Sequence, residues 1–106
     1  MFTGGSYEEV ARWLLVFLNS HAKRESPRIE AMLEAGADRA GSTFGVRLRL
    51  EEEYYPPLDR PAIEFSFQEV SAGKGSFPWC EGVGKRVRRW AQEVLAAEPN
   101  RPSKSA

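Results

Sequence analysis

The stretch GVGKRVRRW, residues 82–90, places four cations within five positions directly after two glycines. Lysine and arginine beside free backbone amides at a helix start bind phosphate groups well. The same residues also fit the solvent-exposed face of an amphipathic helix, because Val83, Val87, Trp90 and Val94 fall within about 60° on a helical wheel. The sequence therefore leaves two interpretations open, a phosphate site and a plain basic surface, and the second is favoured.

A phosphate site at this place would use amides after Gly82 and Gly84. The cations lie in the first half of the predicted helix, where the helix macrodipole disfavours positive charge by roughly a few tenths of a kcal/mol each. That cost favours a role in anion binding. A nucleotide P-loop is excluded, because Trp79 stands where its first glycine is needed and Arg86 where it has Ser or Thr. The candidate phosphate or nucleic-acid contacts are Lys74, Lys85, Arg86, Arg88 and Arg89.

The segment EGVGKRVRRWAQEVLAA, residues 81–97, is similar to the closing helix of double-stranded RNA-binding domains. The predicted order of helix, sheet and final helix also resembles the layout of these domains. In that family a basic pair at the helix start contacts phosphates across a groove, so the resemblance implies this role for Lys85 and Arg86. The similarity covers about 17 residues, and Arg88 and Gln92 stand where the family has alanines.

The other chemically active residue types do not assemble a catalytic or metal site. With Cys80 as the one cysteine, no intramolecular disulfide or paired-cysteine metal site can form. Cys80 is interpreted as a small buried residue, with a reactive thiol beside nearby cations as the alternative. His21, the one histidine, is interpreted as structural, and the carboxylates of residues 51–53 alternate in direction along a strand. We predict no enzyme, no catalytic residue, no metal and no cofactor.

The elements that position these residues begin with a predicted helix from Ser6 to about Lys23. Ser6 and Glu9 have the spacing of a capping box. The apolar residues of this helix cover an arc of roughly 200°, which is wider than one side of a small sheet requires. The helix therefore lies either at the centre of the core or partly against a second chain, and in the second case we predict that Leu15 and Val16 contact the partner.

The remaining pattern predicts a small α+β domain. A second helix is expected over 26–36, where Pro27 follows a Ser cap and Gly36 ends the segment. Alternating apolar residues predict strands over 44–51 and 63–68, which form an antiparallel hairpin with one dry and one wet face. A third strand is considered over 74–79, and the last helix is expected to begin at residue 82 or 84 and to end near 97.

The predicted fold class is therefore α+β: two N-terminal helices, an antiparallel hairpin or three-stranded meander, and a C-terminal amphipathic helix on one sheet face. Residues 1–98 are predicted to form one domain and residues 99–106 a disordered polar tail. The loop with Tyr54, Tyr55 and Leu58 allows two interpretations. These side chains either contact a partner protein or fold back over the open end of the sheet.

Composition limits the classes of function. Fifteen Lys and Arg balance fifteen Asp and Glu, so no overall field attracts nucleic acid or membranes. The N-terminus lacks the features of a signal peptide, and the longest apolar run, residues 13–18, is too short to span a membrane. We predict a cytoplasmic binding or adaptor module that acts through protein–protein contact, as a homodimer or with another protein. The alternative is nucleic-acid binding by the basic face of the last helix.

Overall fold

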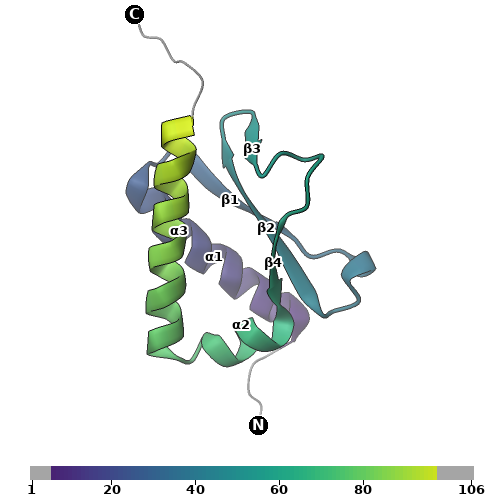
Figure 1. Ribbon diagram of the computed structural model, residues 1–106. Coiled ribbons are helices and arrows are strands. Elements are labelled where there is room, and N and C mark those ends of the chain that lie inside the picture. The colour runs from purple at the N-terminus through teal and green to yellow at the C-terminus, as the bar shows by residue number, and fades with distance from the viewer. Residues whose placement is uncertain (1–5, 98–106) are drawn as a thin grey trace, which may run out of the picture.

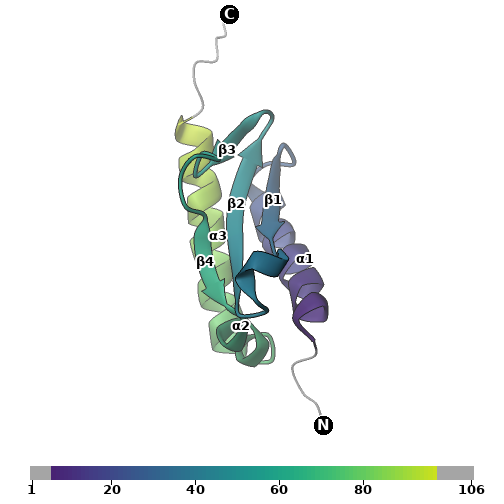
Figure 2. The same ribbon diagram turned by 90° about the vertical axis from the view of Figure 1, so that its right-hand side faces the viewer.

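The computed structural model describes residues 6–97 as a four-stranded antiparallel sheet with helices on one face (Figure 1). The two long helices are α1 (Tyr7–Glu25) and α3 (Phe77–Ala97), and the short α2 (Phe67–Gly73) precedes α3. Figure 2 shows both long helices behind the strands. The structure thus confirms the α+β class, with three α-helices. The predicted disordered tail lies outside the described residues.

The strand β2 (Thr43–Leu50) is the centre of the sheet. It pairs with β1 (Ile29–Glu34) on one side, and with β3 (Glu53–Tyr55) and β4 (Ile63–Ser66) on the other. The antiparallel pairing of β2 with β4 is as predicted, but the two strands do not form a hairpin, because β3 lies between them in the chain. The strand β4 ends at Ser66, since Phe67 already belongs to α2. The strand β3 was not predicted.

Alternate residues of β2 face the helices and form the core with them. Phe44, Val46, Leu48 and Leu50 are at most 2 % exposed. Above them lie the buried stripes of the two long helices, Val10, Leu14, Leu18 and Ala22 from α1 and Val83, Val87, Ala91 and Val94 from α3. The period-two pattern of the strand and the burial of Val83, Val87 and Val94 agree with the predictions, whereas Trp90, predicted in the same stripe, is half-buried.

The capping box of α1 is present as predicted. The Ser6 hydroxyl accepts a hydrogen bond from the Glu9 amide at 3.2 Å, and the Glu9 carboxylate accepts one from the Ser6 amide at 3.0 Å. The helix ends at Glu25, two residues after the predicted end, with Ser26 as its C-cap. Among the described residues no helix has both the length and the apolar content of a membrane span.

The predicted second helix over 26–36 is wrong, because this segment contains β1. Ile29, Ala31 and Leu33 alternate toward the core and lie opposite Leu50, Leu48 and Val46 of β2. The side-chain carbonyl of Asn19 also accepts a hydrogen bond from the Ala31 amide at 2.8 Å. One run of apolar residues satisfied both a helical and a strand period, and pairing with β2 decided between them.

The third strand that was considered over 74–79 is not formed. Lys74 is the C-cap of α2, and α3 begins at Phe77. The Cys80 amide donates to the Ser76 carbonyl at 3.0 Å, which is the first helical hydrogen bond of this turn. Pro78 occupies the first turn of the helix, where its missing amide costs nothing. Gly82 and Gly84 therefore lie inside α3 and do not start it.

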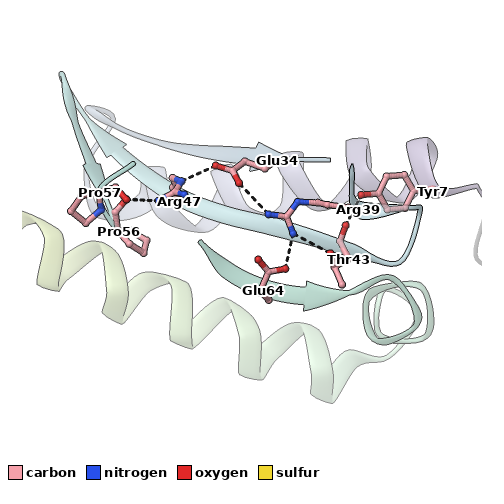
Figure 3. A network of polar contacts seen from close by, with 8 residues as sticks. All are labelled: Tyr7, Glu34, Arg39, Thr43, Arg47, Pro56, Pro57 and Glu64. Atoms are coloured by element: carbon pink, nitrogen blue, oxygen red, sulfur yellow. Dashed lines mark hydrogen bonds and ion pairs between the residues drawn. The ribbon is translucent and has the colours of Figure 1, made fainter. Parts of the chain in front are cut away.

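Charged side chains cover the sheet face that lacks helices (Figure 3). Arg39 forms ion pairs with Glu64 at 2.7 Å and Glu34 at 3.1 Å, and Arg47 contacts Glu34 at 2.8 Å. Arg47 also donates to the carbonyls of Pro56 and Pro57 at 2.9 and 2.6 Å and is only 6 % exposed. The sheet face that was predicted to be solvent-exposed therefore has a buried arginine at its centre.

This network predicts a pH dependence of stability. The hydrogen bond from Arg47 holds the pKa of the Glu34 carboxyl below its ordinary value; burial acts in the opposite direction and is outweighed, while Arg39 adds to the lowering. A carboxyl with a depressed folded-state pKa stabilises the fold above its unfolded-state pKa, and this stabilisation is lost as the pH falls through the folded-state pKa. As the pH falls below about 4.3, the free energy of unfolding measured with urea should therefore decrease less in Glu34→Gln than in the wild type. Glu52→Gln, at an exposed turn position, is the control, and an unchanged slope for Glu34→Gln would contradict the role of the network.

The early start of α3 predicts opposite effects at its two glycines. A Cβ at Gly82 would meet no atom within 4 Å, so Gly82→Ala should stabilise the chain by about 0.5–1 kcal/mol through helix propensity. A Cβ at Gly84 would lie 2.6 Å from Cε1 of His21, so Gly84→Ala should destabilise it. Urea unfolding midpoints test both. Loss of stability in Gly82→Ala would place the helix start at that residue after all.

Candidate functional site

A groove of about 300 Å³ lies between β4 and α3. Its lining is apolar at the centre and charged at two positions on α3. The residues are Ile63 and Phe65 from β4, and Val83, Arg86, Val87, Trp90 and Glu93 from α3. Figure 2 shows β4 at the edge of the sheet with α3 behind it.

The topology creates the groove. The helix α3 packs along α1 and against β2, whereas β4 makes few contacts with it. Ile63 and Phe65 point to the helix side because they lie opposite Val46 and Phe44, which are core residues of β2. Phe65 is 5 % exposed but Ile63 is 39 % exposed. The apolar side chains of β4 therefore run from the core to the open side of the groove.

Two opposite charges line the groove. The Arg86 guanidinium lies over the Phe65 ring, with 6.0 Å between its central carbon and the ring centroid. Glu93 follows two helical turns later on nearly the same side of α3. Within residues 6–97 neither side chain has an ion-pair partner. Both charges are thus available to a bound molecule.

The other cations of α3 lie on a different side of the helix. Lys85, Arg88 and Arg89 line a shallow hollow together with Glu25 and Gln92. Lys85 approaches Glu81, one helical turn earlier, at 4.0 Å, and the side-chain amide of Gln92 donates to Glu25 at 3.1 Å. The structure thus brings together three of the five predicted phosphate contacts, while Arg86 belongs to the groove and Lys74 to the end of α2.

The helix start that was predicted to hold a phosphate does not lie at Gly82 or Gly84, because α3 begins at Phe77. The amides of residues 82 and 84 lie in the interior of α3, where backbone amides serve the helix itself. The cations lie near the middle of the helix, and the macrodipole acts only within its first and last turns. The layout also differs from the expected RNA-binding one, since four strands and α2 separate α1 from α3. Contact of these cations with phosphates stays a prediction.

The side chains predicted to contact a protein are distributed over the molecule. Val16 and Leu58 are 70 % and 63 % exposed, whereas Leu15 is half-buried against the core. Tyr55 also packs against the core, which agrees with the interpretation that it covers an end of the sheet. Tyr54 lies on the opposite face, across from Arg49. Contact of these residues with a partner protein stays a prediction.

An aromatic cluster joins α1 to the start of α3. Trp13 stacks on Phe17 with centroids 4.9 Å apart, and Trp79 lies 6.3 and 6.1 Å from these two rings. His21 meets the edge of Phe17 at 4.8 Å, and its buried Nδ1 has no hydrogen-bond partner. Burial above all, and then the charges of Arg24 and Arg88, lower the pKa of His21. These contacts agree with the structural role predicted for this histidine.

Among residues 6–97, the Cys80 thiol and the acidic side chains do not come together as a group that could act on a substrate or hold a metal ion. The half-buried Cys80 thiol donates to the Gly73 carbonyl at 3.5 Å. Glu51 pairs with Arg28 at 2.9 Å. In the part of the chain that the structure describes, no three His, Cys, Asp or Glu side chains gather as ligands for a metal ion.

The groove residues were not predicted as a set. Arg86 was identified only as one cation among four, and Ile63 and Phe65 only as core residues of a strand. The helical spacing of Val83, Val87 and Trp90 indicated a buried stripe, but nothing in the sequence showed that β4 is an edge strand beside it. That placement depends on the unpredicted β1 and β3.

Comparison with known proteins found none that is similar to this chain. No protein-family model matches the chain, and neither a curated protein nor a solved structure does. The geometry of the groove and of the basic hollow is therefore the basis for any functional assignment.

Proposed function

We propose that the chain is a non-enzymatic binding module that contacts a partner protein in the groove between β4 and α3. The observation that carries the proposal is the combination of an apolar groove with two charges that lack ion-pair partners within residues 6–97. Grooves of this kind recognise protein segments through apolar anchors, while a few polar groups at the margins set orientation and specificity.

The exposed residues of the groove give the proposal its energetic basis. Ile63 offers apolar surface to water at an edge strand, and Trp90 remains half-buried beside it. Aromatic and arginine side chains at the centre of an interface account for much of its binding free energy. Trp90 and Arg86 are of these two types and lie one helical turn apart. Self-association is a special case of the same proposal, in which a second copy is the partner.

The proposal predicts that binding depends on the groove and not on exposed apolar residues elsewhere. A display library of random linear peptides and small folded domains, with this chain included, would be selected against the purified wild type. We expect selected binders to lose at least about tenfold in affinity for Ile63→Asp and for Arg86→Glu, since the first removes apolar contact area and the second reverses the groove charge.

Two matched variants serve as controls. Val16→Asp changes an apolar residue that is 70 % exposed and lies on α1, and Arg89→Glu reverses a charge in the basic hollow. Both should bind as the wild type does. Binders that lose affinity for these variants and keep it for the two groove variants would overturn the assignment of the site.

A second candidate function is contact with nucleic-acid backbones by the basic hollow. The observation that favours it is the presence of Lys85, Arg88 and Arg89 on one side of α3. Three phosphate contacts would give weak binding with a salt slope of about −3 on a logarithmic plot. Glu25 in the same hollow opposes it, because its carboxylate repels phosphates.

Fluorescence titration with short DNA and RNA duplexes and single strands separates the two candidates. Our proposal predicts no saturable binding at low salt. The alternative predicts binding that weakens steeply with salt and disappears in Lys85→Glu/Arg89→Glu while circular dichroism shows an intact fold. Both substituted positions are exposed, so the change should leave the core undisturbed.

A further inference from the structure

The edge strand β4 suggests how the groove is occupied, an inference that rests on the function proposed above. We propose that the groove binds an extended peptide segment, which adds to the free edge of β4 as a further strand of the sheet. Within residues 6–97 β4 pairs with β2 alone, so its other edge carries no strand. Strand addition of this kind combines backbone hydrogen bonds with pockets for alternate side chains.

The hydrogen-bond phase of β4 identifies the groups that face outward. The Phe67 amide donates to the Ser42 carbonyl at 2.8 Å, at the place where the β2–β4 register continues beyond Thr43 and Ser66. In an antiparallel ladder, residues that bond to the neighbouring strand alternate with residues that do not. Phe65 and Ile63 therefore bond toward β2. The amide and the carbonyl of Glu64 point to the open edge and are ready for an added strand.

The side chains of an added strand would fit the groove. Alternate residues of a strand point to the same face, so every second side chain of the peptide would point toward α3, as Ile63 and Phe65 do. There it would meet Val87 and Trp90. The volume of about 300 Å³ is at the lower limit for small-molecule pockets, and it suits a few apolar side chains of a peptide.

The two charges define the polar part of the ligand. Arg86 and Glu93 are seven residues apart on α3, which corresponds to about 10 Å along the helix axis. A peptide carboxylate would pair with Arg86, and a lysine or arginine near the other end would pair with Glu93. The chemistry of the ligand is therefore an extended segment with alternating apolar residues, flanked by one acidic and one basic side chain.

Other occupants fit less well. A second copy of this chain is a less suitable occupant, because its own β1, β2 and β4 carry helices on one face, and these helices would have to fit beside α3 of the first copy. A linear peptide carries no helices of its own. A nucleic acid would place its phosphates beside the Glu93 carboxylate and the apolar lining of the groove. Both would disfavour the binding of phosphates.

The test uses a peptide selected from the random linear library on the wild-type chain. Amide hydrogen exchange, read by NMR, should slow by about tenfold or more at Glu64 when this peptide is bound, because its amide then donates to the peptide. N-methylation of every second peptide amide in one phase should abolish binding, and methylation in the other phase should leave it intact, because an added strand uses only alternate amides.

The outcomes separate this inference from the proposed function. Peptides whose binding is lost in Ile63→Asp and Arg86→Glu, together with protection of Glu64, support both. The same losses with unchanged exchange at Glu64, or with equal effects of the two methylation phases, overturn strand addition and keep the groove as the binding site. If no selected peptide or domain distinguishes the groove variants from the wild type, both are overturned. Concentration-dependent dimerisation that is lost in these variants would replace the peptide by a second copy.

Discussion

The rest of the structure depends on the pairing of β2 with every other strand. Because β1 occupies one side of β2 and the short strands β3 and β4 share the other, β1, β3 and β4 all lie at an edge of the sheet. The core face of β2 packs against α1 and α3. Its other face is closed by Arg47, whose charge is compensated by Glu34 and by two proline carbonyls. The buried Arg47 side chain thus covers a sheet face that has no helices. Removing Glu34 would leave the Arg47 charge buried without a partner, which is strongly destabilising.

The groove follows from the same arrangement. The strand β4 is held by one neighbour, and the chain then turns through α2 before α3 returns along α1. The helix therefore covers β2 and approaches β4 only at the side chains that line the groove. Apolar residues that are buried in the core at Phe65 continue to an exposed Ile63, and Arg86 extends across the Phe65 ring. The groove is thus formed where the apolar core reaches the surface, and the same strand and helix that build the core also line the groove.

Local signals in the sequence predicted local structure well. The capping box at Ser6 and the alternation from Phe44 gave the positions of α1 and β2, and the stripe of Val83 and Val87 gave the buried face of α3. The secondary-structure predictions were wrong where a contact between residues distant in the sequence determines the structure. Residues 29–34 fit two periods, and only their register with β2 makes them a strand. The basic residues of α3 were identified, but their separation into a groove side and a hollow side depends on the position of β4, which no local pattern encodes.

The claim that the groove is the contact site is tested most directly by chemical-shift mapping. Isotope-labelled protein would be titrated with any binder selected against it, and backbone amides and the tryptophan indole N–H signals would be followed. The account predicts that the largest shifts occur at Glu64 and at the indole N–H of Trp90, with little change around Val16 and Lys85. Shifts concentrated on the basic hollow or on the exposed side of α1, with β4 unchanged, would contradict it.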